Sequence, residues 1–178
     1  MIGGPSMQLA RVFGVRIGVH ASWFVVLGIS IFVMSDYFER RLDVTTSGAY
    51  LVAVAAVLLF FASLILHELG HAIVARRAGI GISGIDLWFF GGVAKLSRDS
   101  QSPGEEFRIA AAGPLVTLIV VAICLSSSAL IQDGAALEFA RLAGDAQASP
   151  TLALLGFLAT MNGILFVFNL IPAFPLDG

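Results

Sequence analysis

Charged side chains are scarce in this chain of 178 residues. They make up 12% of the sequence, whereas a typical soluble domain contains about 25%. So few charges cannot cover a water-soluble globule, which makes a soluble enzyme or a disordered segment a poor interpretation. The 10 lysines and arginines against 12 aspartates and glutamates give a net charge of −2, so the chain lacks the basic balance of a nucleic-acid binder.

Cysteine is nearly absent, because Cys124 is the single one in the sequence. It cannot form a disulfide within the chain, and its isolation excludes zinc modules built from several cysteine ligands. Since Cys124 lies in an uncharged apolar run, we expect it to be a small core residue. A clean signal peptide is also missing, because no small-residue cleavage site follows the first apolar stretch.

Hydrophobic residues, in contrast, make up 58% of the chain, and its mean hydropathy is +0.94. Four stretches approach or exceed the length of about 20 apolar residues that crosses a bilayer as a helix. They cover residues 17–34, 48–75, 109–131 and 151–176. The sequence therefore predicts a mainly α-helical membrane protein with four transmembrane helices, in one domain that covers residues 1–178.

The positive charges lie mainly on one side of these predicted spans. Seven of the 10 lysines and arginines precede the first span or lie between the second and third, and three lie in the other two loops. Cytoplasmic loops carry such an excess of lysine and arginine. We therefore expect a multi-pass protein of the plasma membrane whose N- and C-termini face the cytoplasm.

The segment 79–98 is apolar, rich in glycine and too short to span a membrane as a helix. Its aromatic and β-branched residues between glycines predict a β-hairpin. Such backbone lies at membrane depth only where protein buries it or where it lines a cavity. The alternative is an interfacial loop anchored by Trp88 and Phe89. Residues 11–22 also alternate, which is compatible with a strand before the first helix.

The second apolar stretch contains the motif His67-Glu68-Leu69-Gly70-His71. Histidines at positions i and i+4 share one face of a helix, so both rings can bind one zinc ion. Glu68 is then placed to accept a proton from a zinc-activated water. A purely structural role would require partners for three costly ionisable groups inside a span, and the first helix offers only His20.

A catalytic zinc site requires a third protein ligand. His20 is one candidate, with packing or anchoring as the alternative role. Asp177 is the favoured candidate, because it ends an apolar span that Pro172 and Pro175 must break; its alternative role is a solvated end of the span. At 1.5 Å per residue, the pair of histidines lies on the order of 10 Å below the membrane surface marked by Arg76.

Four motifs together resemble the site-2 protease family of intramembrane zinc metalloproteases. They are HELGH in the second span, FFGGVAKL after it, AAAGP at the start of the third and NLIPAFPLDG at the end of the fourth. They occur in the family's order, and the absence of a segment long enough for a PDZ domain fits the compact bacterial and archaeal type. The resemblance implies that His67, His71 and Asp177 bind one Zn²⁺ per chain and that Glu68 is the catalytic base.

The resemblance also implies residues that bind substrate. Asn169 matches the asparagine before the proline break and is expected to hold substrate backbone or the oxyanion. Asn162 is expected to do the same or to bond between helices. The strand with Gly91 and Gly92 resembles a hairpin that guides an extended substrate by β-addition. Thr117 stands where the family often has asparagine, so we expect a weaker polar role there.

The implied reaction is hydrolysis of peptide bonds within or near transmembrane helices, known as regulated intramembrane proteolysis. The implied substrate is a single-pass membrane protein, such as an anti-sigma factor or another membrane-bound regulator. The lipid bilayer is the expected surrounding, nucleic acid is not an expected partner, and a homo-oligomer is left open. Family members continue beyond the aspartate motif with further helices, and some carry cytoplasmic CBS domains.

Two other functions use the same histidine pair. One is a zinc transporter or sensor without proteolysis, which gains little from a base such as Glu68 beside the ligands. The other is the class of membrane HExxH proteases whose third ligand is a glutamate on a later helix. Glu105 and Glu106 are the acids near the start of a later span, and they have the pattern of ordinary first-turn residues.

Overall fold

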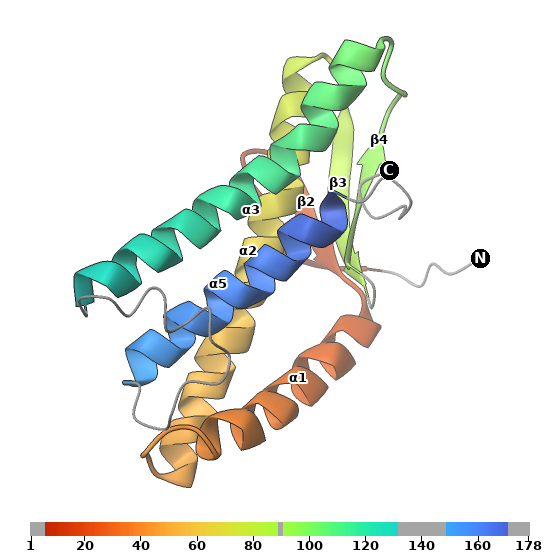
Figure 1. The fold of residues 1–178 in the computed structure, drawn as a ribbon. Helices are drawn as coiled ribbons and strands as arrows, with labels where there is room; N and C mark the ends of the chain where they lie inside the picture. Colours follow the sequence, from red (N-terminus) through yellow and green to blue (C-terminus); the bar gives the residue numbers. More distant parts are fainter. Residues whose placement is uncertain (1–5, 89–90, 132–148, 171–178) are drawn as a thin grey trace.

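The computed structural model describes residues 6–88, 91–131 and 149–170. Within these ranges, four helices and four strands follow one another along the chain (Figure 1). Their order and bounds are β1 (Met7–Val12), β2 (Val15–Val19), α1 (Ala21–Glu39), α2 (Thr46–Arg77), β3 (Ile82–Trp88), β4 (Gly91–Leu96), α3 (Pro103–Ile131) and α5 (Pro150–Asn169).

The four helices are each long and apolar enough to cross a membrane, which confirms the expected mainly helical architecture. Helix α2 is the longest, at 32 residues, and packs against α1, α3 and α5 (Figure 1). The side of α2 toward α1 is rich in buried alanines, which let Phe38 of α1 lie against Ala49 and Ala53. Helix α2 is therefore the scaffold on which the other elements are placed.

The first span begins at Ala21, and the expected start at residue 17 is wrong. Residues Val15–Val19 form β2 instead, because Val15, Ile17 and Val19 are buried on one face of a sheet. His20 then caps α1, with its ring nitrogen Nδ1 accepting a hydrogen bond from the backbone N–H of Ser22. The alternating pattern before the first helix thus belongs to strands.

The other spans also differ at their ends. Helix α3 begins at Pro103 and not at residue 109, because its first turn takes up charged residues that a search for apolar runs leaves out. Helix α5 ends at Asn169 and not at residue 176, in agreement with the rule that a helix stops before a proline such as Pro172. Helix α2 extends two residues beyond the expected bounds 48–75 at each end.

The expected β-hairpin in segment 79–98 is confirmed as the antiparallel pair β3 and β4. It belongs to a larger sheet with the order β1-β2-β3-β4, in which β2 and β3 are parallel. One face of this sheet contributes Val15 and Ile85 to a core with Leu69 and Ala72 of α2. The interfacial-loop alternative is therefore wrong for residues 82–88 and 91–96.

Two contacts hold the N-terminal strands against the rest of the protein. Arg16 of β2 forms an ion pair of 3.1 Å with Asp86 of β3. The turn between β1 and β2 has positive φ angles at Phe13 and Gly14, and Arg76 at the end of α2 donates a hydrogen bond to the Phe13 carbonyl oxygen. The sheet is thereby fixed beside the half of α2 that carries the histidine motif.

Candidate active site

His67 and His71 lie one helical turn apart on α2, with their rings turned toward the same space. Their side chains are buried, with 2% and 9% of their surface exposed. The Nε2 atoms of the two rings are 3.2 Å apart. This separation follows from the i, i+4 spacing, which places both side chains on the face of α2 that packs against α3.

Helix α3 supplies the hydrogen-bond partners of both rings. Nδ1 of His71 is 2.7 Å from the carbonyl oxygen of Ile109, and since a carbonyl only accepts, this nitrogen carries the proton. Nδ1 of His67 is 2.7 Å from the Thr117 hydroxyl oxygen. That hydroxyl donates its own proton to the Gly113 carbonyl oxygen at 3.3 Å, so it accepts from the ring.

The Nε2 atoms that face each other are consequently both without a proton. The side-chain amide of Asn169 agrees with this assignment, because its Nδ2 donates toward Nε2 of His67 at 3.3 Å. Nitrogens bound at 2.0–2.1 Å to one tetrahedral zinc lie about 3.3–3.4 Å apart, close to the 3.2 Å observed between the two rings. The pair therefore fits a zinc ion.

Thr117, for which only a weaker polar role was expected, contacts His67 directly through its hydroxyl. The sequence does not predict the contact between His71 and the Ile109 carbonyl oxygen, because every residue type has a backbone carbonyl. Gly113 and Thr117 do leave a signal, a glycine and a hydroxyl residue one turn apart around the AGP motif. This pair of residue types indicates that one face of α3 packs closely against a neighbouring helix.

Gly113 is the point where the α3 backbone comes nearest to the two rings. A Cβ atom at this position would overlap Nε2 of His71 and would lie 2.7 Å from Nε2 of His67. The adjacent Pro114 lies inside α3 and has no N–H to donate. The absent side chain of Gly113 thus leaves room beside the two nitrogens for an ion or for substrate.

Glu68, which follows His67 in the motif, lies against strand β4. A Cβ atom at Gly92 would be 2.6 Å from Cγ of Glu68, 2.8 Å from its Cδ and 3.0 Å from Oε1. Gly91 precedes it in the strand and is paired with Trp88 of β3. The structure therefore brings Glu68 and the predicted substrate strand together.

The two predicted asparagines occupy different environments. Asn169 ends α5 next to His67, as described above. Asn162 lies about two turns earlier in α5 and is fully buried. Its Nδ2 donates to the Leu158 carbonyl oxygen of the same helix at 2.9 Å. Its Oδ1 is buried and has no hydrogen-bond partner among the residues that the structure describes. Asn162 thus lies in the buried interior of the protein, whereas Asn169 lies next to the histidine pair.

The structure assigns other roles to two alternative metal ligands. Among the described residues, no three histidine, cysteine, aspartate or glutamate side chains could together hold a metal ion. His20 caps α1, and Glu105 accepts a hydrogen bond from the Gln101 N–H and forms an ion pair with Arg98 at 3.3 Å. Asp177 lies outside the described residues.

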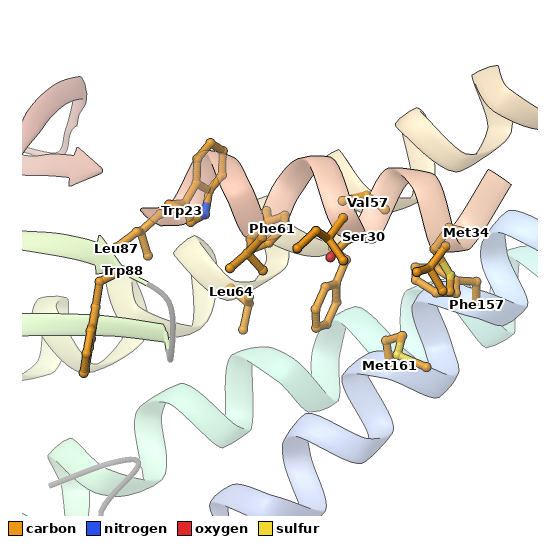
Figure 2. Close-up of a pocket in the computed structure, with 14 residues that line it drawn as sticks. Trp23, Ser30, Met34, Val57, Phe61, Leu64, Leu87, Trp88, Phe157 and Met161 are labelled. Carbon is orange, nitrogen blue, oxygen red and sulfur yellow. The ribbon is translucent and has the colours of Figure 1, made fainter. Parts of the chain in front are cut away.

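An apolar pocket of about 580 Å³ lies between α1, α2 and α5 (Figure 2). Trp23 on α1, Phe61 on α2 and Met161 on α5 contribute to its walls. The pocket extends to Leu87 and Trp88, the last residues of β3, which pair with Gly92 and Gly91 of β4. It therefore connects the apolar helices with the strands beside Glu68.

Comparison with known proteins agrees with this arrangement. The sequence model of peptidase family M50 matches residues 55–178. A Synechocystis protein named as a zinc metalloprotease is 32% identical over 99% of this chain and 44% of its own length. The zinc metalloprotease of Methanocaldococcus jannaschii is 34% identical over 97% of this chain and 43% of its own length.

Among solved structures, the site-2 protease from Methanocaldococcus jannaschii superposes with a TM-score of 0.58 and 29% identity. The match covers 98% of this chain and 68% of that chain. This chain spans less than half the length of the curated relatives that it matches. The four apolar helices and these similarities identify a multi-pass membrane protein, and the names of the relatives support Zn²⁺ as its cofactor. The family match confirms the expected resemblance: the chain belongs to peptidase family M50.

Proposed function

We propose that this chain is the core domain, residues 1–178, of an intramembrane zinc metalloprotease that hydrolyses peptide bonds within or near transmembrane helices. The observation that carries the proposal is the pair of buried Nε2 atoms of His67 and His71, 3.2 Å apart, a separation that matches two nitrogens bound to one zinc ion. The family membership supplies the type of reaction.

His67, His71 and Asp177 hold one zinc ion in this proposal. When bound, zinc polarises the scissile carbonyl and lowers the pKa of a water molecule. Glu68 accepts the proton of that water and delivers it to the leaving amine. Its neighbour Gly92 leaves the carboxylate the room it needs for both transfers.

The substrate is held by two elements. Its extended backbone adds to the strand of Gly91 and Gly92, which places the scissile bond next to Glu68. The Asn169 amide, which lies at Nε2 of His67, donates a hydrogen bond to the substrate carbonyl or to the oxyanion. Asn162, two turns earlier in α5 and bonded to the Leu158 carbonyl oxygen, is the second asparagine proposed to contact substrate.

The substrate arrives from the bilayer as an apolar helix. Its peptide bonds become available only after local unwinding, because a helix satisfies and shields them internally. The pocket between α1 and α5 accepts apolar side chains and leads to the end of β3. A single-pass protein such as an anti-sigma factor or another membrane-bound regulator fits this route. The distribution of lysine and arginine supports a plasma-membrane orientation with both termini in the cytoplasm.

Zinc content tests the proposed site before any substrate is known. The full chain is purified in detergent as parent, His71→Ala, Asp177→Ala and Glu68→Gln, and zinc is measured per chain. We expect about one zinc in the parent and in Glu68→Gln, and loss of zinc in the two ligand variants, since a catalytic site takes three protein ligands. Zinc that is indifferent to Asp177 would refute the proposed ligand set.

Cleavage then separates proteolysis from zinc transport or sensing. The parent and Glu68→Gln are reconstituted with a panel of single-pass membrane proteins, and the cut ends are identified by mass spectrometry. We expect cuts within or next to the membrane span by the parent and none by Glu68→Gln. Cleavage that persists in Glu68→Gln would exclude Glu68 as the base.

A further inference from the structure

We infer that Thr117 is a positioning residue of the metal centre, because its hydroxyl fixes the ring of His67 with Nε2 turned toward His71. The inference rests on the proposed function, since it concerns the same histidine pair. It adds a residue that lies 50 positions from its partner in the sequence and on another helix. It also assigns a task to a position where the sequence indicates only a weak polar role.

The direction of the hydrogen bonds carries the inference. Thr117 is buried, with 1% of its surface exposed, and its hydroxyl has a single proton. That proton goes to the Gly113 carbonyl oxygen at 3.3 Å, as in other helices where threonine bonds one turn back. Nδ2 of Asn169, which can only donate, lies 3.3 Å from Nε2 of His67, so Nε2 accepts and the proton of the neutral ring lies on Nδ1. The Thr117 oxygen then accepts from Nδ1 at 2.7 Å.

The other tautomer of His67 would carry its proton on Nε2. That proton would point into the space shared with Nε2 of His71, 3.2 Å away, and would block the lone pair that a metal requires. Removal of the Thr117 hydroxyl would take away the acceptor that Nδ1 contacts at 2.7 Å, so the Nδ1 tautomer would lose this preference. The ring would also lose the contact that fixes its rotation.

The two histidines differ in how they are fixed. His71 is held by the Ile109 carbonyl, a backbone atom that a side-chain substitution does not remove. His67 is held by a side chain, so its orientation depends on residue type at position 117. Outer partners of metal-bound histidines typically change metal affinity by about 10- to 100-fold when they are removed. Thr117 is therefore the place where a substitution outside the ligand set weakens the site.

The same helix offers a matched control. Ser128 is as buried as Thr117, at 1% exposed, and its hydroxyl also donates one turn back, to the Cys124 carbonyl oxygen at 2.8 Å. This hydrogen bond lies within α3. Ser128→Ala thus removes a buried α3 hydroxyl of the same kind without touching the histidines.

The experiment measures the zinc dissociation constant by chelator competition on the full chain in detergent. The proteins are the parent, Thr117→Val, Thr117→Ser and Ser128→Ala, and the melting temperature of each zinc-free protein is recorded as well. We expect Thr117→Val to bind zinc about 10- to 100-fold more weakly, whereas Thr117→Ser and Ser128→Ala bind like the parent. Parental affinity in Thr117→Val, or an equal loss in Ser128→Ala, would overturn the inference.

A second measurement stands independently of zinc. The chain has three histidines, so ¹⁵N resonances of the zinc-free protein report the tautomer of His67 directly. We expect the proton on Nδ1 in the parent and in Thr117→Ser, and a mixture of tautomers in Thr117→Val. If the parent fails to bind zinc, the proposed function fails while the tautomer result still decides the role of Thr117. An unchanged tautomer in Thr117→Val overturns that role even where zinc binds.

Discussion

At the scale of single residues, two glycines let the backbone come close to the side chains of His67, His71 and Glu68. Gly113 of α3 lies at the two histidine nitrogens, and Gly92 of β4 lies at the side chain of Glu68. Any larger residue at either position would take space that the ion or the carboxylate needs. The two positions should separate zinc binding from catalysis, because each lies against a different part of the site.

Gly113→Ala is expected to abolish zinc binding, because its Cβ would overlap Nε2 of His71. The measurement is zinc per chain after purification in detergent. Gly163→Ala on α5 is the control, since a Cβ there meets nothing within 4 Å. Full zinc content in Gly113→Ala would show that the ion binds elsewhere than between the two rings.

Gly92→Ala is expected to keep zinc and to lower the cleavage rate. Its Cβ would meet Cγ, Cδ and Oε1 of Glu68, and this flexible side chain would move aside without disrupting the fold. A displaced base loses part of its contribution, which is typically about 10²–10⁴-fold for general acid–base catalysis. The kcat of the reconstituted enzyme checks this, and a parental kcat would contradict the placement of Glu68 against β4.

At this scale, the sequence predicts the histidine pair better than it predicts the residues that contact the two rings. The HELGH spacing suffices to place His67 and His71 on one helical face, because it depends only on local helix geometry. Thr117 and the Ile109 carbonyl escape prediction, because their contacts with the rings depend on how α3 packs against α2. Asp177 was predicted from the charge that ends an apolar span and from the family motif, and it stays a prediction.

At the scale of elements, the approach of α2 and α3 controls whether the histidines reach their partners. Gly70 lies between His67 and His71 in the sequence, and a Cβ at this position would be 2.9 Å from the Ala112 carbonyl oxygen. Small residues at such crossings let two membrane helices approach closely. The hydrogen bonds from α3 to both rings therefore depend on this contact.

Gly70→Val is expected to destabilise the packing of α2 on α3 by about 1–3 kcal/mol, the typical cost of extra atoms in a packed interface. Unfolding in mixed detergent micelles measures the change. Gly28→Val on α1 is the matched control, because nothing lies within 4 Å of a Cβ there. Equal stability of the two variants would mean that α2 and α3 are farther apart than described.

Hydropathy alone predicts the helices, since each span is a continuous apolar run. It misplaces the start of α1, because Ile17 and Val19 are as apolar as helix residues but are buried in a parallel pairing with β3. It also predicts α3 too short, because the first turn of α3 contains Glu105, the ion-pair partner of Arg98 in the segment before the helix. Hydrophobic periodicity does not predict which distant segments of the chain pair as strands.

At the scale of the whole molecule, the orientation in the membrane is the open prediction. Cys124 is buried in α3, so the chain carries a single, shielded thiol and accepts introduced cysteines as reporters. Gln101→Cys lies in the loop before α3 and Asp43→Cys in the loop before α2, and both positions are exposed. The two loops lie on opposite sides of the membrane in the predicted topology.

A membrane-impermeant maleimide added to intact cells is expected to label Asp43→Cys and not Gln101→Cys. Broken cells should label both, whereas the parent with Cys124 alone provides the background. The excess of lysine and arginine in the loop before α3 is the reason for this direction. The reverse pattern would place the N-terminus outside and contradict the cytoplasmic assignment of both ends.

The parallel pairing of Ile17–Val19 with Ile85–Leu87 sets an order for biosynthesis. Both α1 and α2 lie between these strands in the chain, so β3 can join β2 only after two spans have left the ribosome and crossed the bilayer. Strand β4, with Gly92 at Glu68, follows β3 and takes its place later still. The nascent chain therefore inserts its histidine pair first and adds β4, the strand that contacts Glu68, afterwards.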